Sequence, residues 1–131
     1  MTSCYCILLR KAGRRLTARY DAALKPFGIT VAQFSHLRHV GRSEPVSLTV
    51  LADRLDLDRS TVGRNSKVLE RMGLLNVGPG EDQREQVLTL TRDGREMLVR
   101  AAPAWDAAQA EVGERLGTEG RAKLAEILAL M

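Results

Sequence analysis

A run of basic side chains between Asp58 and Met72 has the composition and spacing to bind a polyanion. Four cations stand against Glu70 alone, a net charge of +3 over about four helical turns: Arg59, Arg64, Lys67 and Arg71. At about 100° per residue, one helical side presents Ser60, Thr61, Arg64, Lys67, Val68 and Arg71, and the other presents Val62, Ser66, Leu69 and Met72. Such side chains bond phosphates and base edges, so this face is a candidate DNA-binding surface. The alternative interpretation is a solvated basic face.

Two cysteines near the start of the chain, Cys4 and Cys6, can be inert small hydrophobes, a redox sensor or part of a metal site. Arg10 follows Cys6 by one helical turn, and a nearby cation lowers a thiol pKa. Residues two apart point about 200° away from each other on a helix, so a Cys4–Cys6 bond requires local unwinding. His36 and His39 share a helix face, but no third histidine exists. We expect surface or interface histidines and no metal site.

The basic segment forms the second helix of a predicted helix-turn-helix that begins at Leu48. A first short helix carries Leu51, Ala52 and Leu55 on one side, and the small Ala52 lets two steeply crossed helices approach closely. After a short break, Asp58 is placed to cap the second helix by accepting backbone N–H bonds.

A hairpin is predicted directly after this helix. Residues 74–77 form its first strand, residues 78–82 make an irregular Gly-Pro-Gly tip, and residues 86–91 alternate as the returning strand. Arg84 then projects from the tip, where an arginine can enter a minor groove. Asp82 can hold its guanidinium through a charge-assisted bond, although an ordinary turn ion pair is the alternative.

Amphipathic helices are predicted on both sides of this module. The first spans about residues 4–25 and ends at Pro26 and Gly28, and the second follows the N-cap Thr30 until residues 41–45 break it. Thr91 caps a long helix over residues 92–116, which Pro103 kinks and Gly117 closes, and Thr118 opens the last helix. The outer helices are too apolar on one side to stand alone. We therefore expect a two-fold homodimer rather than a monomer that packs them on its own core.

Composition narrows the class of protein. The 131 residues suit one domain, and the net charge of +4 favours a polyanionic partner. We expect no membrane span, because no run of about 18 apolar residues occurs, and we expect a cytoplasmic location, because a signal-peptide order is missing. Nucleophile-elbow, Walker, zinc-protease and dinucleotide motifs are also missing, so neither an enzyme nor a bound cofactor is expected. A winged helix that binds only other proteins remains an alternative.

The segments LADRL, LDLDRSTV, LERMGLL and EDQREQVLTLT resemble, in that order, the multiple antibiotic resistance regulator (MarR) family of bacterial transcription factors. This resemblance implies a mainly α, winged helix-turn-helix homodimer that binds pseudo-palindromic operators, most often as a repressor. It implies one domain over residues 1–131, with a DNA-binding lobe over about 30–91 and dimerisation helices over about 4–25 and 92–131. The DNA contacts are then expected from Arg59, Ser60, Thr61, Arg64, Lys67, Arg71, Asp82 and Arg84.

The first helix, YCILLRKAGRRLTARY, also resembles that of the organic hydroperoxide sensors (OhrR) of this family. Cys6 falls on their reactive cysteine and Tyr20 on one tyrosine that holds its thiolate, whereas Arg10 and Val31 replace the other two tyrosines. Fourteen helical residues span roughly 21 Å, so a contact between Cys6 and Tyr20 must join two subunits. Oxidised Cys6 needs Cys4 of either chain, a small thiol or further oxidation to complete a switch. Three effector hypotheses stay open: a peroxide, a small aromatic or phenolic ligand, or none.

Overall fold

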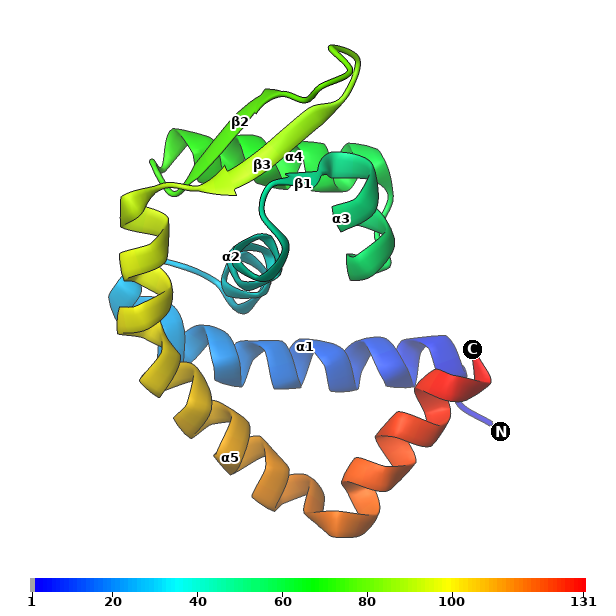
Figure 1. The fold of residues 1–131 in the computed structure, drawn as a ribbon. Helices are drawn as coiled ribbons and strands as arrows, with labels where there is room; N and C mark the ends of the chain where they lie inside the picture. Colours follow the sequence, from blue (N-terminus) through cyan, green and yellow to red (C-terminus); the bar gives the residue numbers. More distant parts are fainter. Residues whose placement is uncertain (1) are drawn as a thin grey trace.

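The computed structural model describes residues 2–131. Its helices and strands follow one another in this order (Figure 1): α1 (Tyr5–Leu24), the 3₁₀ helix η1 (Lys25–Phe27), α2 (Val31–Ser43), β1 (Val46–Ser47), α3 (Leu48–Leu55), α4 (Arg59–Arg71), β2 (Leu75–Pro79), β3 (Gln86–Leu90) and α5 (Arg92–Leu130). The mainly helical, winged helix-turn-helix prediction is confirmed. In the described part of the chain, no helix is long and apolar enough to cross a membrane.

The helix-turn-helix consists of α3 and α4, each held by a side-chain cap. The Ser47 hydroxyl accepts the N–H of Val50 at 3.1 Å at the start of α3, and Asp58 caps α4 as predicted. Asp56 ends α3 in the left-handed region, at φ 54°. Leu51 and Ala52 are buried between the two helices, as their spacing predicts.

The wing contains one more strand than the sequence predicted. The sheet order is β1-β3-β2, all antiparallel, with Val46 opposite Leu88 and Val77 also opposite Leu88 on the other edge. The two-residue β1 is too short to show an alternating pattern. It ties the entry to α3 to the base of the wing.

Helix α5 connects the wing to the far end of the molecule. Thr91 caps it, and Gly94 lies so close to Leu74, the residue before β2, that a Cβ there would overlap the carbonyl oxygen of Leu74. The helix continues through Pro103 and changes direction at Gly117, where φ is 68° (Figure 1). The predicted break at Gly117 is therefore present, as a kink between two helical segments.

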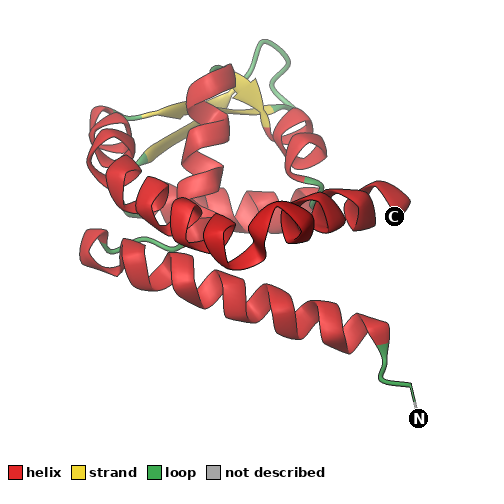
Figure 2. Cartoon of the chain, turned by 90° about the horizontal axis from the view of Figure 1, so that it is seen from below, coloured by secondary structure: helices red, strands yellow, loops and turns green. Residues whose placement is uncertain are grey.

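The hydrophobic core lies in the lobe made by α2, α3, α4 and the sheet, with Leu24 from α1 and Ala101 from α5. Helix α1 contacts α5 and lies below this lobe in Figure 1, and Figure 2 shows the molecule from that side. Leu24 is the one fully buried side chain of α1, while large apolar residues at the start of α1 and the end of α5 are exposed: Tyr5, Ile7, Leu8, Leu9, Leu124, Ile127, Leu128 and Leu130.

Candidate nucleic-acid interface and sensor residues

The outward face of α4 carries the predicted DNA-binding residues together. Six of them are exposed or half-buried: Arg59, Ser60, Thr61, Arg64, Lys67 and Arg71. Within residues 2–131, none of the four cations among them takes part in an ion pair. The single acid of the helix, Glu70, turns toward the wing, where its Oε2 accepts the N–H of Val77 at 3.3 Å. The positive charge of this face is thus free to meet phosphates.

The first turn of α4 is organised around Asp58. Its Oδ1 accepts the backbone N–H of Thr61 at 2.7 Å and the hydroxyl of Ser60 at 2.8 Å. These bonds, the backbone bond first, lower the pKa of the Asp58 carboxyl to about 2. The carboxylate therefore stays ionised at neutral pH and holds Ser60 and Thr61 at the N-terminal end of α4.

The inward face of α4 differs from its prediction at one residue. Val62, Ser66 and Leu69 are fully buried, but Met72 is 42% exposed. Met72 is the C-cap of α4 and still donates its backbone N–H to Val68 at 3.0 Å, but its side chain lies at the surface, where its sulfur accepts a hydrogen bond from the side-chain nitrogen of Gln33 at 3.9 Å. The Ser66 hydroxyl hydrogen-bonds Nε2 of His36 at 2.9 Å. His36 is buried, so the expected surface or interface position is wrong for this histidine.

The wing tip spans residues 80–85 and exposes Arg84. Asp82 accepts the backbone N–H of Arg84 at 3.1 Å, whereas the expected bond from its carboxylate to the guanidinium is not formed among the described residues. Asp82 therefore shapes the turn and leaves the Arg84 side chain free.

The sensor candidates do not come together within one chain. Cys4 and Cys6 are both exposed, and Cys4 is the N-cap of α1 with extended backbone, so the expected geometry of two cysteines within one helix is wrong. Arg10 is exposed on the same helix. The Tyr20 hydroxyl donates to Oε1 of Gln109 on α5, and burial raises its pKa. Within the described residues, no group of three or more His, Cys, Asp or Glu side chains has the arrangement to hold a metal ion.

Comparison with known proteins places this geometry in a family. The family model described as MarR family matches residues 27–85. The M. tuberculosis transcriptional regulator MosR, in a crystal structure with DNA, is 38% identical, with a TM-score of 0.86 over 95% of this chain and 93% of that chain. The chain belongs to the MarR family.

Two further relatives agree with this membership. The repressor CouR of Rhodococcus jostii RHA1, bound to a 23-mer DNA duplex, is 27% identical, with a TM-score of 0.83 over 97% of this chain and 91% of that chain. The uncharacterized HTH-type regulator YhbI of Bacillus subtilis is 30% identical over 75% of this chain. The chain spans just under two thirds of the curated relatives it matches, 64% of YhbI and 62% of YwoH. MarR-family proteins are DNA-binding transcriptional regulators, not enzymes.

This MarR-family chain also has an aromatic cleft that the sequence did not indicate. Trp105 of α5 stacks on Phe34 with ring centroids 5.9 Å apart and lies 6.3 Å from the ring of Tyr20. The Arg38 guanidinium lies 4.4 Å from the Trp105 ring centre, a cation–π contact. These residues border a cavity of about 360 Å³ between α1, α2 and α5. No local spacing predicts this cleft, because its rings come from three different helices.

Proposed function

We propose that this protein is a sequence-specific, DNA-binding transcriptional repressor that acts as a homodimer on a pseudo-palindromic operator. The observation that carries the proposal is the outward face of α4, whose four cations lack ion-pair partners in residues 2–131. The exposed Arg84 at the wing tip adds a fifth cation for the neighbouring groove. The similarity to MosR in complex with DNA supports the same role.

The salt dependence of duplex binding tests this proposal. Cations that neutralise phosphates release counterions, so log affinity must fall steeply and linearly with log salt concentration. A matched pair of duplexes, one palindromic and one scrambled, separates specific from general binding. A duplex affinity that does not change with salt concentration overturns the DNA-binding proposal. The alternative is then a winged helix that binds only other proteins.

Homodimerisation is proposed from the apolar side chains left uncovered on α1 and α5. They gather at the beginning of α1 and the end of α5, where the chain has no core of its own, and a hollow of about 550 Å³ lined by Leu16, Leu116, Leu124 and Leu128 lies between these helices. Exposed apolar surface of this kind marks an interface. In a two-fold dimer each copy covers the other, and two recognition helices meet major grooves about 34–36 Å apart.

Release from DNA on oxidation of Cys6 is the first candidate for regulation. The Cys6 thiolate attacks the O–O bond of an organic peroxide, takes up the terminal oxygen as a sulfenic acid and leaves the alcohol. A second thiol, from Cys4 or a small molecule, then forms a disulfide and water leaves. Cys6 lies next to Ile7 among the exposed apolar side chains, so a polar or bulky sulfur there disturbs the proposed interface.

A small aromatic ligand is the second candidate, and the aromatic cleft favours it. Trp105, Phe34 and Tyr20 supply ring surfaces, and Arg38 and Arg42 add positive charge to the same cavity. An aromatic or phenolic acid matches this combination of stacking and charge. The two candidates separate experimentally, because a Trp105→Ala variant loses the ligand response and keeps the peroxide response.

A further inference from the structure

Helix α4 is attached to the rest of its lobe through a buried face that contains one polar side chain. It buries Val62, Ser66 and Leu69, and Ser66 is completely inaccessible to solvent. Among residues 2–131, His36 and Ser66 are the two polar side chains that fall in the buried class, and they bond each other at 2.9 Å. A hydrogen bond depends on the direction between donor and acceptor, whereas burial of apolar side chains does not. This polar pair therefore adds an orientation requirement to an otherwise apolar contact.

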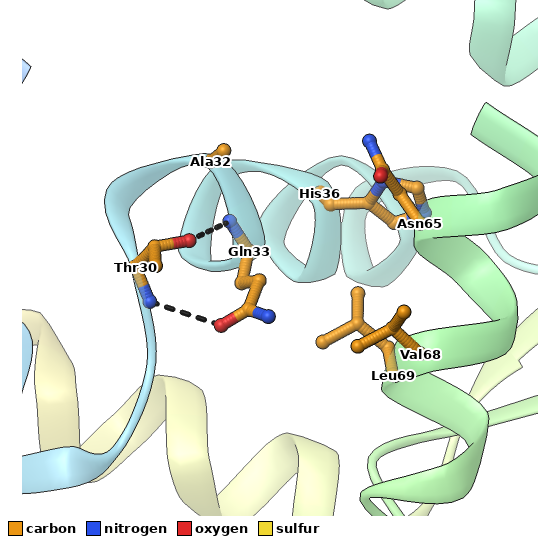
Figure 3. Close-up of a pocket in the computed structure, with 7 residues that line it drawn as sticks. All are labelled: Thr30, Ala32, Gln33, His36, Asn65, Val68 and Leu69. Carbon is orange, nitrogen blue, oxygen red and sulfur yellow. Dashed lines mark hydrogen bonds between the residues drawn. The ribbon is translucent and has the colours of Figure 1, made fainter. Parts of the chain in front are cut away.

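A cavity lies beside this pair, at the contact between α2 and α4. Its volume is about 160 Å³, it lies between the first turns of α2 and the outer flank of α4, and Asn65 and Val68 line it (Figure 3). The apolar contacts of Val62 and Leu69 hold α4 against the lobe. The hydrogen bond to His36 adds to them a directional contact between the buried face of α4 and α2.

Helix α2 is a fixed reference for that bond. The Thr30 hydroxyl accepts the N–H of Gln33 at 3.2 Å, and the Gln33 side chain accepts the N–H of Thr30 at 3.0 Å, a complete capping box (Figure 3). Phe34, Leu37 and Val40 bury the other side of α2 in the core. His36 thus extends from a capped helix, packed in the core, to the buried face of α4.

We propose that His36 is a positioning residue for DNA recognition, which sets through Ser66 the side of α4 that faces the operator. Arg64 and Lys67 flank Ser66 in the sequence, so a rotation that breaks the His36 bond moves both cations relative to the base edges. Phosphate contacts tolerate such a displacement, because they depend mainly on charge, whereas bidentate contacts to bases depend on geometry. This inference rests on the proposed function as a sequence-specific DNA-binding protein.

The protonation of His36 is consistent with this role. Burial, and secondly the nearby His39, lower the pKa of His36 to about 4. The ring is neutral at physiological pH, so the bond to Ser66 carries no net charge into the core. His39 makes its own bond to the carbonyl oxygen of Ser35 at 2.8 Å and does not compete for Ser66.

The test measures the ratio of operator to scrambled-duplex affinity, with the thermal midpoint as the control for folding. Ser66→Ala and the double variant His36→Leu/Ser66→Ala remove the bond, and the double variant leaves no buried polar group unpaired. We expect both to lose about tenfold in the affinity ratio, because base contacts are lost while scrambled-duplex affinity is kept. His36→Gln, in a chain that keeps Ser66, retains a polar group at a similar reach. We expect this variant to keep most of the wild-type affinity ratio.

The outcomes separate the two levels of the proposal. A ratio within twofold of the wild type in both variants overturns the positioning role. A ratio that recovers together with the thermal midpoint in the double variant also overturns it, because a purely structural role predicts that result. A wild-type protein without any operator preference removes the proposed function itself, and the positioning role with it.

Discussion

The Arg64 guanidinium donates a hydrogen bond from Nη2 to the Thr61 hydroxyl at 3.3 Å, one turn earlier on α4. Both side chains lie on the outward face, so the bond directs the guanidinium toward the N-terminal end of the recognition helix. An arginine directed in this way is prepared to make a two-point contact with guanine.

Replacing Arg64 tests whether this arrangement reads bases. Arg64→Ala is expected to reduce discrimination at one operator position by about 1–3 kcal/mol. Arg84→Ala at the wing tip is the matched control, because it removes the same charge and is expected to weaken all duplexes more evenly. Competition binding with single-base operator variants measures both. Equal loss on operator and random duplex for Arg64→Ala rules out base reading.

The close approach of α5 to the backbone of Leu74 predicts a large effect at Gly94. A Cβ at this position overlaps the Leu74 carbonyl oxygen, which is backbone and cannot turn aside, so Gly94→Ala should destabilise the fold by roughly 2 kcal/mol or more. Gly13→Ala is the control, because nothing lies within 4 Å of its Cβ and alanine favours a helix by about 1 kcal/mol. Urea unfolding of the two variants should give opposite signs. A neutral Gly94→Ala would contradict the packing.

Disruption of the exposed apolar patch tests the homodimer. Leu128 on α5 is 76% exposed, and Leu128→Glu should shift the protein to monomers, because a charge would be buried without a partner. Val99→Glu is the control, since Val99 is 75% exposed on the same helix but lies away from the patch. Light scattering after size-exclusion chromatography reports the mass. An unchanged dimer in Leu128→Glu, or a monomeric wild type, would refute this interface.

The redox hypothesis predicts different roles for the two exposed thiols. Cys6→Ser should abolish release from DNA after a mild organic hydroperoxide, because serine cannot form a sulfenic acid. Cys4→Ser should still react at Cys6 and stop at the sulfenic acid or a mixed disulfide. Intact-mass spectrometry and operator binding on the same samples measure both effects. Peroxide-induced release in Cys6→Ser would eliminate this mechanism.

Burial of His36 predicts a defined pH dependence of stability. The pKa falls from 6.5 in the unfolded chain to about 4 in the fold, so the unfolded state binds the proton first as the pH decreases. Stability should fall between about pH 6.5 and pH 4, by an amount on the order of 3 kcal/mol. The contribution of Asp58 is lost only below about pH 4, because its pKa is lowered to about 2. In urea unfolding, His36→Gln should remove the fall in the free energy of unfolding between about pH 6.5 and pH 4. The same fall in the variant would show that His36 does not cause it.

Several features of the fold could be predicted because they depend on near neighbours in the chain. Thr30, Asp58 and Thr91 cap their helices as expected, since a cap needs only a short polar side chain and the backbone three residues later. The kink at Gly117 follows from the conformational freedom of glycine. The expectation for His36 was wrong because a distant residue decides its place: its partner Ser66 lies on another helix, and the packing of the two helices buries both side chains.

The sequence by itself determined the winged helix-turn-helix, the net positive face of α4 and the MarR-family membership. The helices, their caps and the positive face follow from periodicity, capping and composition, which act over a few residues, whereas the family membership follows from the resemblance of four sequence segments. Tertiary structure alone decided that His36 bonds Ser66 thirty residues away, that Tyr20 bonds Gln109 and that β1 joins the wing. Such pairings depend on how the helices pack against one another, and no local pattern in the chain specifies which distant side chain fills each space.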